Sequence, residues 1–82
     1  MMYYIYILRS EQNGDIYVGS TKDVQQRFLL HNQGKVKSTK GYRPWILMRT
    51  EEYNMRSDAF QREMFLKTGQ QKEILRKQYM AP

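Results

Sequence analysis

Two short runs rich in aromatic and β-branched residues open the chain and predict a pair of strands. Residues 3–9 read Tyr-Tyr-Ile-Tyr-Ile-Leu-Arg, and residues 16–18 read Ile-Tyr-Val. Segments of this length and composition favour a strand over a helix. Between them stands Asn13-Gly14, a dipeptide that strongly indicates a tight hairpin turn. If these two residues form the centre of the turn, the pattern predicts a β-hairpin in which Ser10 lies opposite Tyr17.

This pairing divides the hairpin into two faces. Side chains alternate along a strand, so even-numbered positions of the first strand share a face with odd-numbered positions of the second. The residues predicted on one face are Tyr4, Tyr6, Leu8, Tyr17 and Gly19. The tyrosines among them have two explanations, as strand residues that pack a core and as hydroxyl groups for chemistry.

A helix and an irregular segment are expected after the hairpin. An apolar stripe at helical spacing runs over residues 22–32, where Ser20 or Thr21 is in position to cap the helix. Residues 33–43 are basic, contain glycine and show no period, which predicts a loop over the surface.

The second half of the chain predicts one more strand and two helices. Residues 45–53 are typical of a strand that is entered after a proline. A helix capped near Ser57 is expected to run to Thr68, and a last helix to span residues 71–79. The predicted fold class is α+β, a small three-stranded sheet with helices packed against it in the order β-β-α-β-α-α.

Length and composition set further limits. A chain of 82 residues predicts a single domain over residues 1–82. The absence of cysteine excludes disulfides and thiolate metal sites, so any metal would use oxygen ligands or the single histidine. No run of about 18 apolar residues is present, and the opening residues lack a secretory pattern. These features predict a cytoplasmic protein with no membrane partner.

The net charge of +6 is concentrated in one third of the chain. Residues 24–50 contain no acid and six bases, whereas the remaining residues hold eight bases and eight acids. A localised positive excess indicates a polyanionic partner. Nucleic acid is favoured over a membrane because no amphipathic helical period accompanies the charge. The alternative is an ordinary solvated loop.

Glu63 stands among apolar positions of the helix expected after Ser57. On a helical wheel it falls within an apolar arc formed by Ala59, Phe60, Met64 and Leu66. A lone carboxylate in such surroundings costs desolvation free energy unless it is paired or holds a cation. The two explanations are an ion pair with Lys67, one turn further along, and a metal-binding carboxylate.

Arg27 and His31 lie four residues apart on the flank of the apolar stripe in residues 22–32. Together with the tyrosines and Glu63 they form a set suited to phosphate chemistry. Arginine can neutralise charge on a phosphate, tyrosine or histidine can accept a proton from water, and a divalent ion can stabilise a leaving oxygen. The alternative for His31 is a hydrogen-bonded boundary residue.

Several motifs in register resemble the GIY-YIG nuclease superfamily. Tyr4-Ile5-Tyr6 is followed by ten residues and then by Tyr17-Val18-Gly19, with Arg27, His31 and Glu63 further along. More narrowly, the chain is similar to the small stand-alone bacterial members related to the N-terminal nuclease domain of the excinuclease, over nearly its whole length. The resemblance implies the family's three-stranded antiparallel sheet flanked by helices.

The activity implied by the resemblance is divalent-metal-dependent hydrolysis of DNA phosphodiesters in repair or recombination. By position, Glu63 would hold Mg²⁺ or Mn²⁺, and Tyr17 would be the leading candidate to activate water. Tyr6 would help to position the phosphate or water, and Arg27 would stabilise the transition state. His31 would assist proton transfer, which leaves the general base open between Tyr17 and His31.

The chain also departs from the family pattern. Tyr4 replaces the first glycine, Ser20 stands where some relatives have lysine, and no residue matches a late asparagine. Gly19 is kept, and would allow a close approach of the backbone at the strand end. The departures favour an alternative, a nucleic-acid-binding module of nuclease ancestry with little or no activity. A protein-interaction domain is a third hypothesis.

The resemblance leaves phosphate binding to the basic segment. The residues concerned are Lys35, Lys37, Lys40 and Arg43. Binding through them is expected to be independent of base sequence and to weaken steeply as salt rises. DNA is therefore the expected partner, and other repair proteins are candidate partners.

Overall fold

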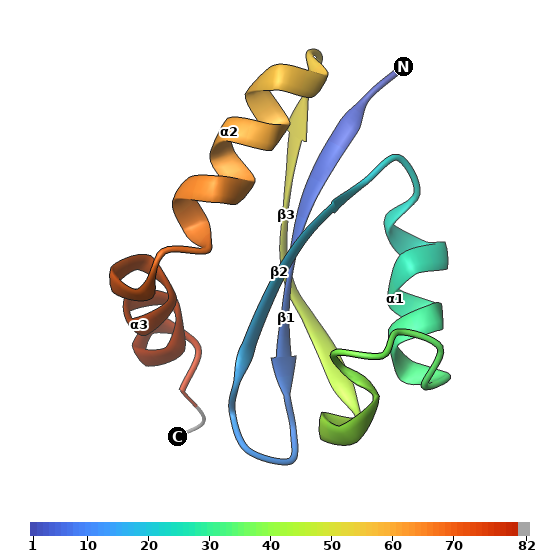
Figure 1. Ribbon diagram of the computed structural model, residues 1–82, viewed down its shortest axis with the longest axis vertical. Helices are drawn as coiled ribbons and strands as arrows, with labels where there is room; N and C mark the ends of the chain where they lie inside the picture. Colours follow the sequence, from blue (N-terminus) through green and yellow to red (C-terminus); the bar gives the residue numbers. More distant parts are fainter. Residues whose placement is uncertain (81–82) are drawn as a thin grey trace.

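A computed structural model describes residues 1–80 as a three-stranded antiparallel sheet with helices on both sides (Figure 1). The elements are β1 (Tyr3–Ser10), β2 (Ile16–Thr21), α1 (Val24–Asn32), a 3₁₀ turn η1 (Lys40–Tyr42), β3 (Trp45–Tyr53), α2 (Arg56–Leu66) and α3 (Gly69–Gln78). The predicted fold class and element order are confirmed. No helix within residues 1–80 is long and apolar enough to cross a membrane.

The strand β1 lies at the centre of the sheet, in the order β2-β1-β3. Helices α2 and α3 cover one face of the sheet, while α1 and the segment after it cover the other (Figure 1). Because both faces are covered, β1 is apolar at consecutive positions instead of alternating. Its residues 5–8, Ile-Tyr-Ile-Leu, are all buried.

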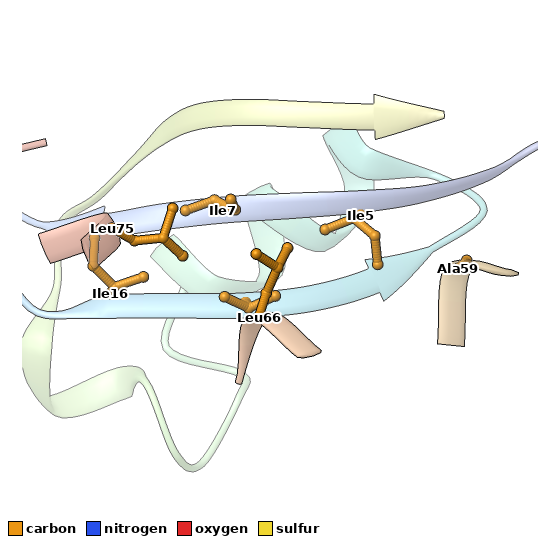
Figure 2. Packing of buried hydrophobic residues seen from close by; sticks show 7 residues of the cluster. Ile5, Ile7, Ile16, Ala59, Leu66 and Leu75 are labelled. Carbon is orange, nitrogen blue, oxygen red and sulfur yellow. The ribbon is translucent and has the colours of Figure 1, made fainter. Parts of the chain in front are cut away.

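Each face of the sheet has its own core. We call the first the aliphatic face, which is formed by Ile5, Ile7, Ile16 and Val18 of the sheet with Ala59, Leu66 and Leu75 of α2 and α3 (Figure 2). We call the second the aromatic face, where the buried residues Tyr6, Leu8 and Trp45 pack with Tyr17, Val24, Phe28 and Leu47. The alternation predicted for the hairpin is confirmed, since Tyr6, Tyr17 and Gly19 share one face.

The register of the hairpin differs from the prediction by two residues. Leu8, and not Ser10, lies opposite Tyr17. A shift of two leaves every side chain on its predicted face, which explains why the faces were predicted correctly with the wrong partner.

The hairpin loop is longer than the expected two-residue turn because side chains bind its backbone. The Ser10 hydroxyl accepts the N–H groups of Gln12 and Asn13, at 3.1 and 3.3 Å. The Asn13 side chain accepts the N–H of Asp15 at 2.9 Å. Gly14 has a positive φ of 76°, whereas no non-glycine residue in residues 1–80 does. The predicted two-residue turn centred on Asn13 and Gly14 is therefore wrong, and of these two residues only Gly14 has a positive φ.

A β-bulge in β3 decides which of its side chains reach the aromatic face. Ile7 lies opposite Arg49, but Leu8 lies opposite Leu47, so Met48 is the extra residue. One extra residue inverts the alternation of side chains beyond it. As a result Trp45 and Leu47 join the aromatic face.

The start of α1 was predicted two residues early. Asp23 caps the helix, and its carboxylate accepts the N–H of Gln26 at 3.1 Å. The predicted caps, Ser20 and Thr21, are still part of β2, where Thr21 pairs with Tyr4. Ser20 and Thr21, which the local sequence favoured as caps of α1, are therefore paired in the sheet instead.

The boundary between α2 and α3 also differs from the prediction. Helix α2 begins at Arg56, one residue before the predicted cap Ser57, and it has no side-chain cap. It ends at Leu66. Thr68 does not end α2 but caps α3, because its hydroxyl accepts the N–H of Gln71 at 3.3 Å. The last helix accordingly starts at Gly69 and not at residue 71.

Candidate active site

Three aromatic rings of the predicted site meet on the aromatic face. The ring centroids of Tyr17 and His31 are 4.8 Å apart, and Tyr6 lies 5.7 Å from His31 and 6.1 Å from Tyr17. The tyrosines come from the neighbouring strands β1 and β2, and the histidine comes from α1. Pairing of the two strands and packing of α1 on the sheet therefore assemble this part of the site.

Gly19 provides the space in which the Tyr6 ring lies. The two residues are paired across β1 and β2. A Cβ added at Gly19 would come within 2.5 Å of both Cζ and the hydroxyl oxygen of Tyr6. Real Cβ atoms essentially never come this close to another heavy atom. Lack of a side chain, and not an unusual φ, is what this position requires.

A chain of hydrogen bonds runs from Tyr6 into the segment after α1. The Tyr6 hydroxyl lies 2.9 Å from His31 Nε2, and His31 Nδ1 lies 2.8 Å from Thr39 Oγ1. The Thr39 hydroxyl donates to the carbonyl of Val36 at 3.4 Å. One tautomer satisfies all these groups: Tyr6 O–H donates to Nε2, and Nδ1–H donates to Thr39.

Burial and a nearby arginine shift the pKa values of both groups. Burial, and then the positive charge of Arg27, lower the pKa of His31 to about 4. Burial raises the pKa of Tyr6 to about 12, against the opposing effect of a hydrogen bond to Arg27. His31 has no exposed surface, and both its ring nitrogens are hydrogen-bonded. It is therefore a neutral imidazole at pH 7.

Arg27 and Tyr17 lie at the solvent side of this cluster. Both are partly exposed, whereas Tyr6 and His31 are buried. Arg27 lies one turn before His31 on α1, and no carboxylate within residues 1–80 forms an ion pair with it. A partly exposed cation that no carboxylate neutralises can receive an anion.

Glu63 lies on α2 and contacts β2 from the aliphatic side. The Ser20 hydroxyl donates to Glu63 Oε1 at 2.7 Å, and Lys67 Nζ lies 2.7 Å from Oε2. The carboxylate side chain is 16% exposed. The ion pair with Lys67 expected as one explanation of Glu63 is confirmed, and Ser20 is a second partner that the sequence did not indicate.

The apolar arc predicted around Glu63 is narrower than expected. Ala59 and Leu66 are buried, but Phe60 and Met64 are more than half exposed. Only one side of α2 reaches the sheet, so Glu63 lies at the edge of the buried stripe and not in its middle. This position leaves the carboxylate partly exposed beside β2.

The donor set fits a single divalent ion with few protein ligands. Within residues 1–80 no group of three or more histidine, cysteine or acidic side chains could hold a metal. An ion would therefore bind through Glu63 together with water and phosphate oxygens. Mg²⁺ is commonly held in this way, by one or two carboxylates and substrate phosphates. Binding there requires the Lys67 ammonium to release one carboxylate oxygen.

The basic segment is exposed, as expected. Its four basic side chains are at the surface, and none pairs with a carboxylate within residues 1–80. Arg43 is the most constrained, since its Nε donates to the carbonyl of Lys40 at 2.7 Å. Its guanidinium lies over Gly34, which has a positive φ of 77° and no room for a Cβ. The others are Lys35, Lys37 and Lys40.

Two residues that support the cluster were not predicted. Thr39 is buried and accepts from His31, although it lies within a basic loop. Trp45 donates from Nε1 to the carbonyl of Thr39 at 2.9 Å, and its ring lies 6.3 Å from that of Tyr17. No local signal marks Thr39, because its partners are distant in sequence or reached through a loop. Trp45 reaches this face only because of the bulge at Met48.

A family model of the GIY-YIG catalytic domain matches residues 2–78. The chain belongs to the GIY-YIG family. It is also similar to UPF0213 proteins, among them one from Staphylococcus haemolyticus, 36% identical over 75 residues and covering 90% of each chain. One from Halobacterium salinarum is 38% identical over 77 residues, covering 90% of this chain and 99% of that protein.

A solved structure supports the fold of this GIY-YIG chain. It is the solution NMR structure of a UPF0213 protein from Bacillus halodurans, with a TM-score of 0.58 and 33% identity. The likeness covers 100% of this chain and 89% of that one. The resemblance inferred from the motifs at Tyr4–Tyr6 and Tyr17–Gly19 is thereby confirmed. Membership of the GIY-YIG family supports a nuclease-like role with DNA as substrate, and nucleases of this family generally use divalent metals.

Proposed function

We propose that this GIY-YIG protein is a divalent-metal-dependent DNA endonuclease, weak and either structure-selective or nonspecific, that acts in repair or recombination. The observation that carries the proposal is that edge strand β2 has candidate groups on both of its sides. Tyr17 projects from β2 on the aromatic face, beside Arg27, which has no carboxylate partner within residues 1–80, and Glu63 is hydrogen-bonded to β2 through Ser20 on the aliphatic side.

We assign Tyr17 as the group that accepts a proton from the attacking water, after its own hydroxyl proton has passed to solvent. Its side chain is partly exposed, as a base that meets solvent and substrate must be. The competing candidate, His31, is fully buried, has both nitrogens engaged and has a pKa of about 4. We therefore assign His31 as a positioning residue that fixes the Tyr6 hydroxyl.

Tyr6 and Arg27 act on the phosphate in this proposal. Because the Tyr6 proton is donated to His31, the Tyr6 oxygen acts as an acceptor toward the Arg27 side and can hold the Arg27 guanidinium in place. Its pKa of about 12 keeps it protonated, which suits positioning and not proton removal. Arg27 stabilises the negative charge that develops on the phosphate, an effect that is strong for a preorganised cation.

Glu63 would hold the divalent ion, which supplies charge stabilisation at the phosphate and the leaving oxygen. Ser20 orients the carboxylate from one side by donating to Oε1. Lys67 occupies the other oxygen, Oε2. A metal ion at Oε2 would compete with the Lys67 ammonium for this oxygen.

The test is cleavage of supercoiled plasmid and branched DNA with Mg²⁺, Mn²⁺ or EDTA. We expect metal-dependent nicking by the native protein and its loss in Glu63→Ala. Glu73→Ala is the matched control, since Glu73 is an exposed glutamate on α3. Cleavage that is unchanged in Glu63→Ala, or that persists in EDTA, would contradict the proposal.

The assignment of the base has its own test. Tyr17→Phe removes the hydroxyl while keeping the ring, and should lower kcat by roughly 10²–10⁴-fold, as for loss of a general base. Nearly full activity in Tyr17→Phe would remove Tyr17 from this role.

A second candidate function is a DNA-binding module that does not cleave. The observation that favours it is that Ser20 and Lys67 already engage both oxygens of Glu63. This hypothesis predicts salt-sensitive binding without cleavage under any metal condition. Lys37→Gln should then weaken binding to all DNA sequences alike.

A further inference from the structure

A cavity at the C-terminal end of β2 is not used by the mechanism proposed above. It has a volume of about 240 Å³ and lies between the ends of β1 and β2 and the first turns of α2. Its lining includes Tyr3, Ser20, Thr21, Lys22, Arg56 and Phe60.

The chemistry of the lining is that of an anion site. Lys22 and Arg56 contribute two positive charges, and no acidic residue lines the cavity. Neither cation forms an ion pair with a carboxylate within residues 1–80. The hydroxyls of Ser20 and Thr21 add neutral hydrogen-bonding groups. Guanidinium, ammonium and hydroxyl donors together are the usual partners of a phosphate.

Aromatic side chains hold one cation and form part of the wall. The Lys22 ammonium lies 5.4 Å from the centroid of the Tyr3 ring, within the range of a cation–π contact. Phe60 is 59% exposed, so its ring is available for stacking by a ligand. Exposed aromatic rings beside cations are typical of surfaces that bind single-stranded nucleic acid.

The cavity adjoins the carboxylate of the proposed active site. Ser20 lines it and also donates to Glu63. The segment after α1, which contains the basic residues, lies beside α1 and the start of β3, away from this cavity (Figure 1).

We propose that the cavity binds a backbone phosphate of the nucleic acid, one that flanks the phosphodiester at Tyr17 and Glu63. Identification of the ligand as nucleic acid rests on the proposed function. The cavity adds a second phosphate site to that of the basic segment.

The first experiment measures binding of a fluorescent oligonucleotide in EDTA, where metal-dependent cleavage is absent. Lys22→Gln and Arg56→Gln should each weaken affinity by about threefold to tenfold and reduce the salt slope by about one. Lys77→Gln is the matched control, because it removes one exposed charge at the end of α3. The control should stay within about twofold of the native protein. All three side chains are exposed, so the variants should fold.

The second experiment locates the ligand by NMR. A short oligonucleotide should shift the backbone amides of Lys22, Arg56 and Phe60. Inorganic phosphate should shift them only weakly and should be displaced by the oligonucleotide. The proposal fails if the shifts are confined to residues 35–43 and the two variants match Lys77→Gln. It also fails if phosphate saturates the cavity and the oligonucleotide does not compete.

These outcomes separate the cavity from the nuclease activity. If no cleavage is found but Lys22→Gln and Arg56→Gln weaken binding, the cavity stands and the endonuclease proposal falls. If Glu63-dependent cleavage is found and the two variants bind normally, the endonuclease proposal stands and the cavity falls.

Discussion

The two faces of the sheet are built from the same three strands but differ in chemistry. The buried side chains of the aliphatic face are those of Ile, Val, Leu and Ala, which carry no polar atom, and the tyrosines that pack against them are only partly buried. The aromatic face buries the Tyr6 hydroxyl and the His31 imidazole, and both must be satisfied by hydrogen bonds. The aliphatic face therefore stabilises the fold without needing specific hydrogen bonds. The aromatic face holds polar groups in fixed positions, and its stability depends on each hydrogen-bond partner being present.

The two faces of the sheet also differ in how much free energy of unfolding a lost contact costs. Full burial of an aliphatic side chain contributes about 1.5–3 kcal/mol to the free energy of unfolding, and this contribution does not require a partner in a fixed direction. A buried hydroxyl or imidazole contributes far less in net terms, and costs about 1–3 kcal/mol if its partner is lost. The aromatic face should accordingly be the more sensitive to small changes in geometry.

Leu66→Ala should have the largest effect, and on stability alone. Leu66 is 2% exposed at the centre of the aliphatic face, so truncation should lower the free energy of unfolding by about 2–5 kcal/mol. Urea denaturation measures this loss. DNA binding per folded molecule should be unchanged at low temperature. A loss of affinity in the folded variant would mean that the two faces are not independent.

Gly19→Ala should affect both stability and the site. The added methyl group meets the Tyr6 ring, and overpacking of this kind typically costs about 1–3 kcal/mol. Gly41→Ala is the matched control, since a Cβ there has no heavy atom within 4 Å. Thermal unfolding and the ring resonances of Tyr6 and His31 report the change. Equal behaviour of the two variants would show that the aromatic face is more plastic than its packing indicates.

The pH dependence of stability should follow His31, the only histidine of the chain. Its pKa falls from an ordinary 6.5 to about 4 in the folded protein, so below pH 6.5 the unfolded chain binds the extra proton. Stability is thus full above pH 6.5 and is lost as the pH falls toward 4. The loss should amount to about 1–3 kcal/mol.

The single histidine C2–H resonance gives this pKa directly by NMR titration. His31→Phe should flatten the stability profile between pH 6.5 and 4.5, where few other side chains titrate. A resonance that titrates near 6.5 would show that the imidazole is not held as described.

Glu51→Gln should have the smallest effect, because its network lies at the rim of the aliphatic face. Its carboxylate accepts two hydrogen bonds from Arg62, at 2.9 and 3.1 Å, and one from the Tyr53 hydroxyl at 2.9 Å. The Arg62 hydrogen bonds, foremost, lower the pKa of Glu51. The contribution of the ionised Glu51 carboxylate to stability is therefore fully present above the ordinary glutamate pKa. It is lost as the pH falls through the lowered pKa of Glu51 in the folded protein.

Since Arg62 is partly exposed, we expect a cost of about 1 kcal/mol at pH 7. The difference from the native protein should shrink in denaturation experiments as the pH falls below the ordinary glutamate pKa. Glu52→Gln is the control, because Glu52 is exposed and makes no ion pair within residues 1–80. A cost equal to that of Leu66→Ala would place this rim within the core.

Local patterns predicted most of the fold. The third strand has its expected bounds of 45–53, and the alternation of the hairpin placed Tyr6 and Tyr17 on one face. What failed depended on side-chain bonds within loops or on pairing between strands. The hydroxyl of Ser10 lengthened the hairpin loop, and strand pairing took Thr21 away from the helix cap. Neither effect leaves a periodic signal.

Less of the candidate site could be predicted from local sequence patterns. The family resemblance marked Tyr6, Tyr17, Arg27, His31 and Glu63, and the structure brings the first four together on the aromatic face. The full burial of His31 and its bond to Thr39 could not be predicted, because they depend on how a loop folds back over α1. The partners of Glu63 come from β2 and from its own helix, and only Lys67 could be foreseen from spacing.

The bulge at Met48 has a consequence for how this chain can vary. Side chains along a strand alternate between the two faces of the sheet with a period of two residues. The bulge shifts this alternation by one residue between the two segments of β3. Loss of one residue there would move the side chains of Trp45 and Leu47 from the aromatic face to the aliphatic face. The position that the Trp45 indole fills beside Tyr17 would then be empty. Lengths of β3 among relatives should therefore differ by even numbers of residues, or by an odd number together with gain or loss of the bulge.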